Sequence, residues 1–185
     1  MVAVSPPRIP CLVERRCQGS AEQPKVDKKL FDLSLELLES LHRHKVEYIL
    51  VGGLALGSHG LVRATEDIDL FLETSADNVD RLKAALRQVW DDDCIDEITH
   101  EDLAGDYPTI RYGPPGDDFI VDLLGRLGES FSYSDLEAET KVFRGIQVRV
   151  ATPRTLYRMK RDTVRSKDKV DAEALRQTFP EVEVP

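Results

Sequence analysis

The stretch from Tyr48 to Glu73 constrains the fold most, because a buried strand, a glycine pair and two carboxylates follow one another within it. The run from Tyr48 to Val51 is apolar or aromatic and predicts a buried strand, after which the chain breaks at Gly52 and Gly53. The short apolar segment that follows predicts about two turns of helix ending at Gly60. A strand, a helix and a further apolar run in this order indicate a mixed α/β chain.

Two aspartates in the next apolar run, Asp67 and Asp69, point to the same side of the predicted strand. Side chains alternate along a strand, and these two Cα atoms are roughly 6.5 Å apart at a rise of about 3.3 Å per residue. Carboxylates this close repel each other unless a cation lies between them. A divalent metal ion is the simplest explanation, and we expect both aspartates to bind it.

Gly52 and Gly53 lie at the predicted turn from strand to helix. Glycines at such a turn let the backbone approach a ligand closely, and the N–H groups at the start of a helix favour a phosphate. A phosphate site beside an Asp-x-Asp strand is what metal-assisted transfer of a nucleotidyl group requires. We therefore predict that both glycines bind the triphosphate of a nucleotide.

The order of these motifs resembles the signature of the DNA polymerase β-like nucleotidyltransferase superfamily. In this chain an apolar residue and the glycine pair are followed by a spacer of thirteen residues and then by Asp-apolar-Asp-apolar. Within the superfamily the chain is most similar to the AbiEii-like family, which includes the toxins of type IV toxin–antitoxin systems. The similarity rests on the string Gly52-Gly53…His59-Gly60…Arg63-Ala-Thr65-Glu-Asp67-Ile-Asp69-Leu.

The resemblance implies functional roles for Arg63 and Thr65, since in this family the Arg-x-Thr-x-Asp-x-Asp element is part of the active site. A guanidinium before the carboxylate strand suits bidentate binding of triphosphate oxygens. The Thr65 hydroxyl either contacts a phosphate or fixes the turn. His59, just before Gly60, is assigned to the end of the short helix, with substrate contact as the alternative.

A third carboxylate, Asp122, lies in the apolar run from Phe119 to Leu124. An isolated carboxylate in a buried strand costs free energy unless it has a partner, so Asp122 either faces solvent or joins Asp67 and Asp69. The resembled superfamily has a third acid at this place in the chain order. The resemblance therefore implies that Asp122 is the third catalytic acid and metal ligand.

Near the C-terminus the resemblance extends to a helical lysine that is followed by a Lys-Asp-x-x-Asp run. Lys160, Lys167, Asp168 and Asp171 match this pattern, although charged residues replace the usual small ones between them. By this resemblance we expect Lys160 to bind the nucleotide and to neutralise charge that develops on pyrophosphate.

The remaining pattern predicts a small, mixed, twisted sheet that is flanked by helices and carries the acids along one edge. Thr152 and Pro153 predict the N-cap and the first residue of a last helical region. The expected elements are helices at 28–44 and 77–90, a hairpin of strands at 109–112 and 119–124, a loop with a short helix at 125–140, a strand at 146–150 and helical structure after residue 152.

The chain is predicted to contain one nucleotidyltransferase domain, residues 26–178, with a basic helical C-terminal segment at 152–178. Residues 1–25 hold four prolines and no apolar period, and we expect a disordered extension there. No run of about twenty apolar residues is present, so neither a transmembrane helix nor a membrane partner is expected. Three cysteines without metal-type spacing favour a reduced, cytoplasmic setting.

Charge is unevenly distributed along the chain. The net charge of −9 argues against indiscriminate binding of nucleic acids, yet residues 141–170 hold ten Lys or Arg and only two Asp. This basic segment predicts a surface for triphosphate, RNA or an acidic partner, with a solvated helix face as the alternative. The acidic run at 91–93 is interpreted as a solvated turn, because three consecutive acids cannot all face one ion.

These features predict an enzyme, a nucleotidyltransferase that uses two Mg²⁺ ions to transfer a nucleoside monophosphate from an NTP to an acceptor hydroxyl. The resemblance suggests RNA as the acceptor and a cognate antitoxin as a partner. Two alternatives stay open. One is a small-molecule nucleotidyltransferase that modifies antibiotics, and the other is a non-catalytic domain that binds nucleotide or a partner protein.

Overall fold

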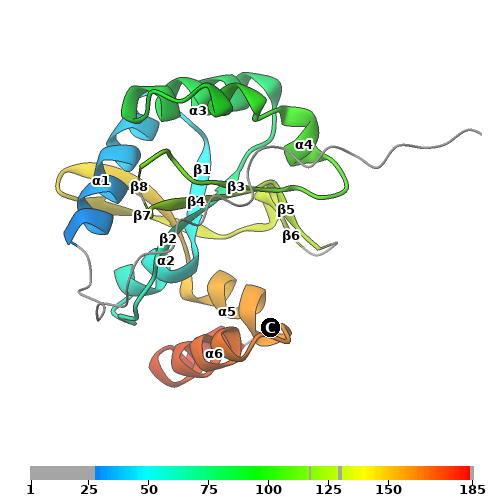
Figure 1. Ribbon diagram of the computed structural model, residues 1–185. Coiled ribbons are helices and arrows are strands. Elements are labelled where there is room, and N and C mark those ends of the chain that lie inside the picture. Colours follow the sequence, from blue (N-terminus) through cyan, green and yellow to red (C-terminus); the bar gives the residue numbers. More distant parts are fainter. Residues whose placement is uncertain (1–27, 117, 129–130, 184–185) are drawn as a thin grey trace, which may run out of the picture.

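The computed structural model describes residues 28–116, 118–128 and 131–183 of the chain. At its centre lies a mixed sheet of six strands with helices on both faces (Figure 1). The extension predicted at residues 1–25 falls outside the described residues. The mixed sheet and its flanking helices confirm the fold class expected from the sequence.

The strands form one large sheet and one small pair. They are β1 (Tyr48–Val51), β2 (Asp67–Leu72), β3 (Thr109–Tyr112), β4 (Ile120–Leu124), β5 (Arg126–Leu127), β6 (Phe131–Ser132), β7 (Ala138–Phe143) and β8 (Ile146–Ala151). The large sheet has the order β3-β4-β2-β1-β8-β7, whereas β5 and β6 pair separately. β2 runs parallel to β4 and antiparallel to β1, and β1 runs parallel to β8. The predicted hairpin of β3 and β4 is confirmed.

Two amphipathic helices, α1 (Lys28–Arg43) and α3 (Ala76–Val89), pack against each other on one face of the sheet (Figure 1). Ser75 caps α3, since its hydroxyl accepts a hydrogen bond from the Asn78 N–H. The residues that recur at helical spacing are buried against the sheet: Leu37, Leu38, Leu41, Val79, Leu82 and Leu86. Both helices predicted for this layer are therefore confirmed. Beyond α3 follow η1 (Asp93–Glu97) and α4 (His100–Ala104).

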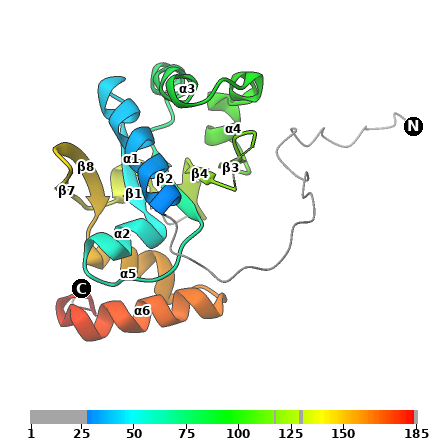
Figure 2. The same ribbon diagram turned by 60° about the vertical axis from the view of Figure 1, so that its left-hand side comes forward.

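On the opposite side of the sheet lie α2 (Gly52–Ser58), α5 (Pro153–Arg161) and α6 (Ser166–Thr178), as the two views in Figures 1 and 2 show. α5 begins as predicted, because the Thr152 hydroxyl accepts from the Thr155 N–H and a proline occupies the first turn. A short 3-10 helix, η3 (Pro180–Glu183), follows α6. None of the described helices reaches the length and apolar content needed to cross a membrane.

The short helix α2 ends where the sequence predicts. Its C-cap is His59, and Gly60 adopts a φ of +87°, a conformation that favours glycine. The His59 imidazole also hydrogen bonds to the Ala151 carbonyl oxygen at 2.8 Å, which ties the end of α2 to β8. These contacts confirm the assignment of His59 to the end of the helix.

Two expectations about the architecture are wrong. The segment 125–140 contains β5, β6, the 3-10 turn η2 (Tyr133–Asp135) and the start of β7, instead of a loop and a helix. The acids lie on β2 and β4, which are interior strands, because the hairpin partner β3 forms the edge of the sheet beyond β4. The helical region predicted after residue 152 is confirmed, and it consists of two helices with a break at 162–165.

Candidate active site

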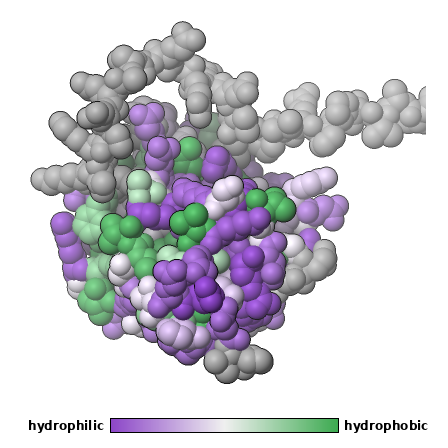
Figure 3. Space-filling view, turned by 90° about the horizontal axis from the view of Figure 1, so that it is seen from below, coloured by the Kyte–Doolittle hydropathy of each residue, from purple (hydrophilic) through white to green (hydrophobic). Residues whose placement is uncertain are grey.

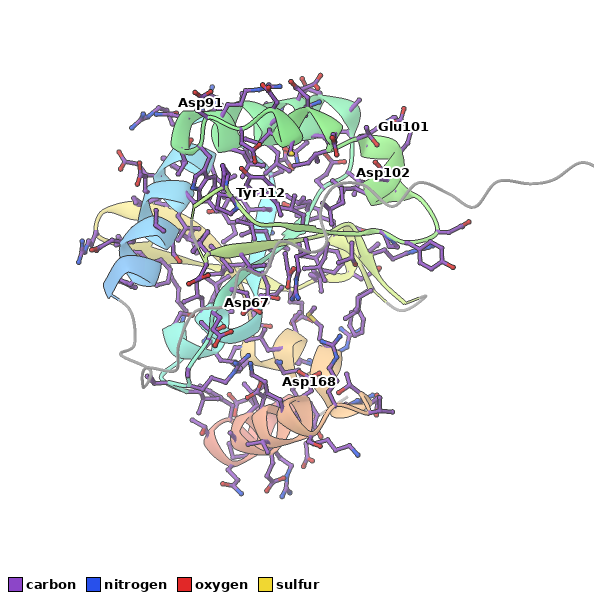
Figure 4. All side chains as sticks on the ribbon, in the orientation of Figure 1. Asp67, Asp91, Glu101, Asp102, Tyr112 and Asp168 are labelled. Carbon is purple, nitrogen blue, oxygen red and sulfur yellow. The ribbon has the colours of Figure 1, made fainter. Side chains whose placement is uncertain are left out.

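The structure brings Asp67, Asp69 and Asp122 together on one face of the sheet. Strand alternation puts Asp67 and Asp69 on the same face of β2, and Asp69 lies opposite Asp122 in the parallel pair with β4. One carboxylate oxygen from each residue lies within 4.8 Å of the other two. In Figure 4 Asp67 lies between the sheet and α6. Among the described residues, no other three acids, histidines or cysteines form such a group.

The glycine pair at the start of α2 packs directly onto this triad. Gly52 has a φ of +65°, and a Cβ atom there would lie 1.7 Å from the Oδ2 atom of Asp69. A Cβ atom on Gly53 would lie 2.6 Å from the Thr65 hydroxyl oxygen. The backbone N–H of Gly53 donates a hydrogen bond to Asp69. Glycine is required at both positions because each backbone touches a side chain of the site.

The carboxyl group of Asp69 is harder to ionise than an ordinary aspartate. Burial, followed by the charges of Asp67 and Asp122, raises its pKa from 3.8 to about 6. The charge of Lys160 and the hydrogen bond from Gly53 act in the opposite direction and are outweighed. The triad therefore stores electrostatic repulsion that a bound cation would relieve.

The raised pKa of Asp69, which is due to burial and then to the charges of Asp67 and Asp122, predicts a pH-dependent stability difference between the wild type and Asp69→Asn without metal. As the pH falls, the folded chain binds the Asp69 proton at a higher pH than the unfolded chain does. Asp69 therefore lowers the free energy of unfolding as the pH rises from about 4 to about 6. Asp69→Asn should therefore raise the free energy of unfolding by on the order of 1–3 kcal/mol at pH 7.5, and by much less at pH 4. Urea denaturation in the presence of a chelator measures both values.

The control for this experiment is Asp80→Asn, which removes an exposed carboxylate on α3. It should change stability by less than about 0.5 kcal/mol at either pH. If the free energies of unfolding of Asp69→Asn and the wild type differ by the same amount at pH 4 and pH 7.5, ionisation of Asp69 does not destabilise the folded chain.

Thr65 orients the first acid of the triad. Its hydroxyl donates a hydrogen bond of 2.6 Å to the Oδ1 atom of Asp67. Of the two roles considered for Thr65, the structure therefore supports a positional one. The other oxygen of Asp67 does not take part in this bond and is available to a ligand.

The two predicted nucleotide-binding cations, Arg63 and Lys160, belong to one ion-pair network, in which Lys160 and Asp171 are buried and Arg63 and Asp168 are partly exposed. The Lys160 ammonium lies 2.7 Å from Asp168 and 2.9 Å from Asp171, and the Arg63 guanidinium lies 3.3 Å from Asp171. Burial opposes ionisation of Asp168, but the hydrogen bond and charge of Lys160 outweigh it and lower the pKa of Asp168. The network joins α5 and α6 to the loop before β2, next to the triad.

Sequence reasoning missed Arg111, which lies on the edge strand β3. Its guanidinium donates two hydrogen bonds of 2.8 Å, from Nε and Nη2, to the two carboxylate oxygens of Asp122. These bonds raise the pKa of Arg111 above its ordinary value. The available signal was the hairpin register, because a turn centred near Gly116 pairs position 111 with position 122.

The acidic run at 91–93 has a structural role. The Asp92 carboxylate accepts hydrogen bonds from the Cys94 N–H at 3.0 Å and from the Tyr112 hydroxyl at 3.1 Å, and so caps η1. Figure 4 shows Asp91 and Tyr112 near α3, on the side of the sheet opposite Asp67. Asp91 and Asp93 are exposed, as expected for a solvated segment, whereas Asp92 is partly buried by its contacts.

The basic residues of segment 141–170 do not form one continuous surface. Lys160 is buried in the ion-pair network, and Arg144 lies 3.8 Å from Asp32 on α1. Arg158 and Arg161, both on α5, stack over the rings of Phe131 and Tyr157. The surface on the α6 side is largely hydrophilic, with separate hydrophobic residues rather than one apolar patch (Figure 3).

Comparison with known protein families gives a match to the chain. The model of a family described as "Nucleotidyl transferase AbiEii toxin, Type IV TA system" matches residues 36–180, which is more than half of the chain. The matched range includes the glycine pair, the three acids and Lys160. No curated protein matches the chain.

Proposed function

This chain belongs to the family of AbiEii nucleotidyltransferase toxins of type IV toxin–antitoxin systems, and from this premise we propose that it transfers a nucleoside monophosphate from an NTP to an RNA hydroxyl. The observation that carries the proposal is the meeting of Asp67, Asp69 and Asp122 beside the glycine pair. A non-catalytic domain would have no reason to keep three repelling carboxylates together. We assign the activity to a domain spanning residues 26–178.

The residues of the triad fit divalent metal ions. Three carboxylates supply hard, charged oxygen ligands, which are the ligands that Mg²⁺ prefers. Their oxygens are within 4.8 Å of one another, and burial together with the charges of Asp67 and Asp122 raises the pKa of Asp69. Asp67, Asp69 and Asp122 would hold two Mg²⁺ ions. When bound, such ions polarise the phosphate that is attacked and stabilise both the entering and the leaving oxygen.

The protein residues around the triad would bind and orient the substrates. Gly52 and Gly53 let the backbone at the start of α2 approach Asp69 and Thr65 closely, and this turn would lie beside the bound triphosphate. Arg63 and Lys160 would neutralise charge that develops on pyrophosphate, since both lie in the network beside the triad. Asp122 would accept the proton of the attacking hydroxyl.

Two arginines on α5 support RNA as the acceptor class. Arg158 and Arg161 are presented on α5, the helix that also carries Lys160. Their guanidinium groups lie over aromatic rings, an arrangement that suits contact with phosphates and bases. The chain would act in the cytoplasm, where NTP and RNA are both present, and a cognate antitoxin would restrain it.

Label transfer tests this function. The purified chain is incubated with Mg²⁺ and each α-labelled NTP in turn, in one series with total bacterial RNA and in a second with aminoglycosides and lincosamides. We expect label in RNA with one or more of the four nucleotides. An Asp67→Asn/Asp69→Asn variant serves as the control.

The possible outcomes separate the candidate functions. Label in an antibiotic and not in RNA would assign the chain to small-molecule nucleotidyltransferases. Binding of Mg²⁺–NTP without any transfer would indicate the non-catalytic alternative. Transfer that survives in the double variant would exclude the triad as the active site.

A further inference from the structure

Arg111 occupies one side of the acid triad and has no part in the proposed reaction. It lies on β3, directly opposite Asp122 in the antiparallel register. Both oxygens of Asp122 accept hydrogen bonds from its guanidinium, in the parallel, two-pronged geometry that arginine forms with carboxylates. The Asp122 side chain is 13 % exposed, whereas that of Arg111 is 58 % exposed.

A guanidinium in this position competes with a divalent cation. Any metal ion that uses Asp122 as a ligand must share its carboxylate with a positive charge already bound there. The two cations repel each other across a few ångströms, and this repulsion is stronger in a partly buried site than in water. The pair with Arg111 therefore opposes the binding of a metal ion at Asp122.

Of the three cations beside the triad, Arg63, Lys160 and Arg111, the most exposed is Arg111, and it is the one that can leave. Lys160 is buried and contacts both Asp168 and Asp171, so its position is determined from the α6 side. Arg111 projects from an edge strand, and more than half of its side chain is in contact with solvent. Its guanidinium can turn outward without moving the strand, while Asp122 stays in place on β4.

We propose that Arg111 is a built-in counter-cation of the metal site. While it is paired with Asp122, Arg111 lowers the affinity of the site for divalent cations, and it releases the Asp122 carboxylate when a nucleoside triphosphate binds. The phosphates of the nucleotide offer the guanidinium another two-pronged partner. Metal and nucleotide then bind cooperatively, and each raises the affinity for the other by the same factor. This inference rests on the proposed function, because it takes the triad to be the metal site.

Titration with Mn²⁺ in the absence of nucleotide tests this proposal, with free Mn²⁺ measured by electron paramagnetic resonance. Arg111→Gln should bind Mn²⁺ about 10- to 100-fold more tightly than the wild type, because the competing charge is gone. Arg111→Met keeps the length of the side chain without its charge, and should behave in the same way. Circular dichroism establishes that each variant is folded, and the Met variant serves if the Gln variant is not.

The wild type and Arg111→Gln also differ in their response to a non-hydrolysable NTP analogue. The analogue should raise the Mn²⁺ affinity of the wild type more than that of Arg111→Gln, in which Asp122 is already free. In an Asp122→Asn background the substitution of Arg111 should have no effect on Mn²⁺ binding. Arg43→Gln removes an equal charge from an exposed pair with Glu39 on α1, and should leave Mn²⁺ affinity unchanged.

Failure of the inference and failure of the proposed function give different results. If Asp69→Asn weakens Mn²⁺ binding but Arg111→Gln binds Mn²⁺ no more tightly than the wild type, the triad is a metal site and the counter-cation role of Arg111 is wrong. If neither Asp69→Asn nor Arg111→Gln changes Mn²⁺ binding, the triad is not the metal site and both proposals fall.

Discussion

The double variant Asp67→Asn/Asp69→Asn is expected to transfer nucleotide at least about 10³-fold more slowly than the wild type. The amides preserve the shape of the site but carry no charge, so they cannot replace carboxylates as ligands of Mg²⁺. Because the three acids lie within 4.8 Å of one another, the substitutions remove two of the three charges from one small site. The initial rate of label transfer to RNA at saturating NTP measures the loss.

Glu66→Gln provides the matched control for this prediction. Glu66 precedes Asp67 directly, but its side chain is exposed. Its loss should change the rate by no more than about twofold, the range usual for surface substitutions. A double variant that keeps a tenth or more of the wild-type rate while remaining folded would contradict the assignment of the triad.

Lys160→Met is expected to destabilise the protein by about 3–5 kcal/mol at pH 7.5. The ammonium of Lys160 is buried, and it is the positive charge between Asp168 and Asp171. Methionine has a similar length, but it leaves the buried carboxylate of Asp171 and the partly buried one of Asp168 without this charge. Urea denaturation measures the free energy of unfolding for both proteins.

The loss should depend on pH with a definite sign. In the wild type Lys160 lowers the pKa of Asp168, so this pair contributes stability at neutral pH that is lost as the pH falls through the lowered pKa. The difference between Lys160→Met and the wild type should therefore shrink towards pH 3. Lys167→Met removes an exposed lysine from α6 and should cost less than about 0.5 kcal/mol. A loss from Lys160→Met no larger than this would refute the argument.

Local patterns in the sequence correctly predicted that Asp67 and Asp69 share one face of a strand. The alternation in β2 places two carboxylates on one face, because successive side chains of a strand point to opposite sides. The helix start at Thr152 was equally readable, since a capping hydroxyl and a proline in the first turn act within a few residues of each other. Such features depend on neighbours in the chain and can be read from it.

The elements at the rim of the sheet were not predictable in this way. β7 is an edge strand in which no side chain is fully buried, so its sequence shows little of the apolar alternation that reveals an interior strand.

The break between α5 and α6 was not predictable either, because it contains neither glycine nor proline. In a continuous helix Lys160 and Asp168 would be about 12 Å apart along the axis, and only the break lets them meet at 2.7 Å.

By itself the sequence determined most of the strands and helices, and that two acids share one face of a strand that follows a glycine pair. The tertiary structure alone decided which charges pair, joining Arg111 to Asp122 across two strands and Lys160 to Asp168 and Asp171 between two helices. The physical reason is the range of the forces that act. Backbone periodicity and capping are set by adjacent residues, whereas the partner of a charge is whichever opposite charge folding brings within a few ångströms.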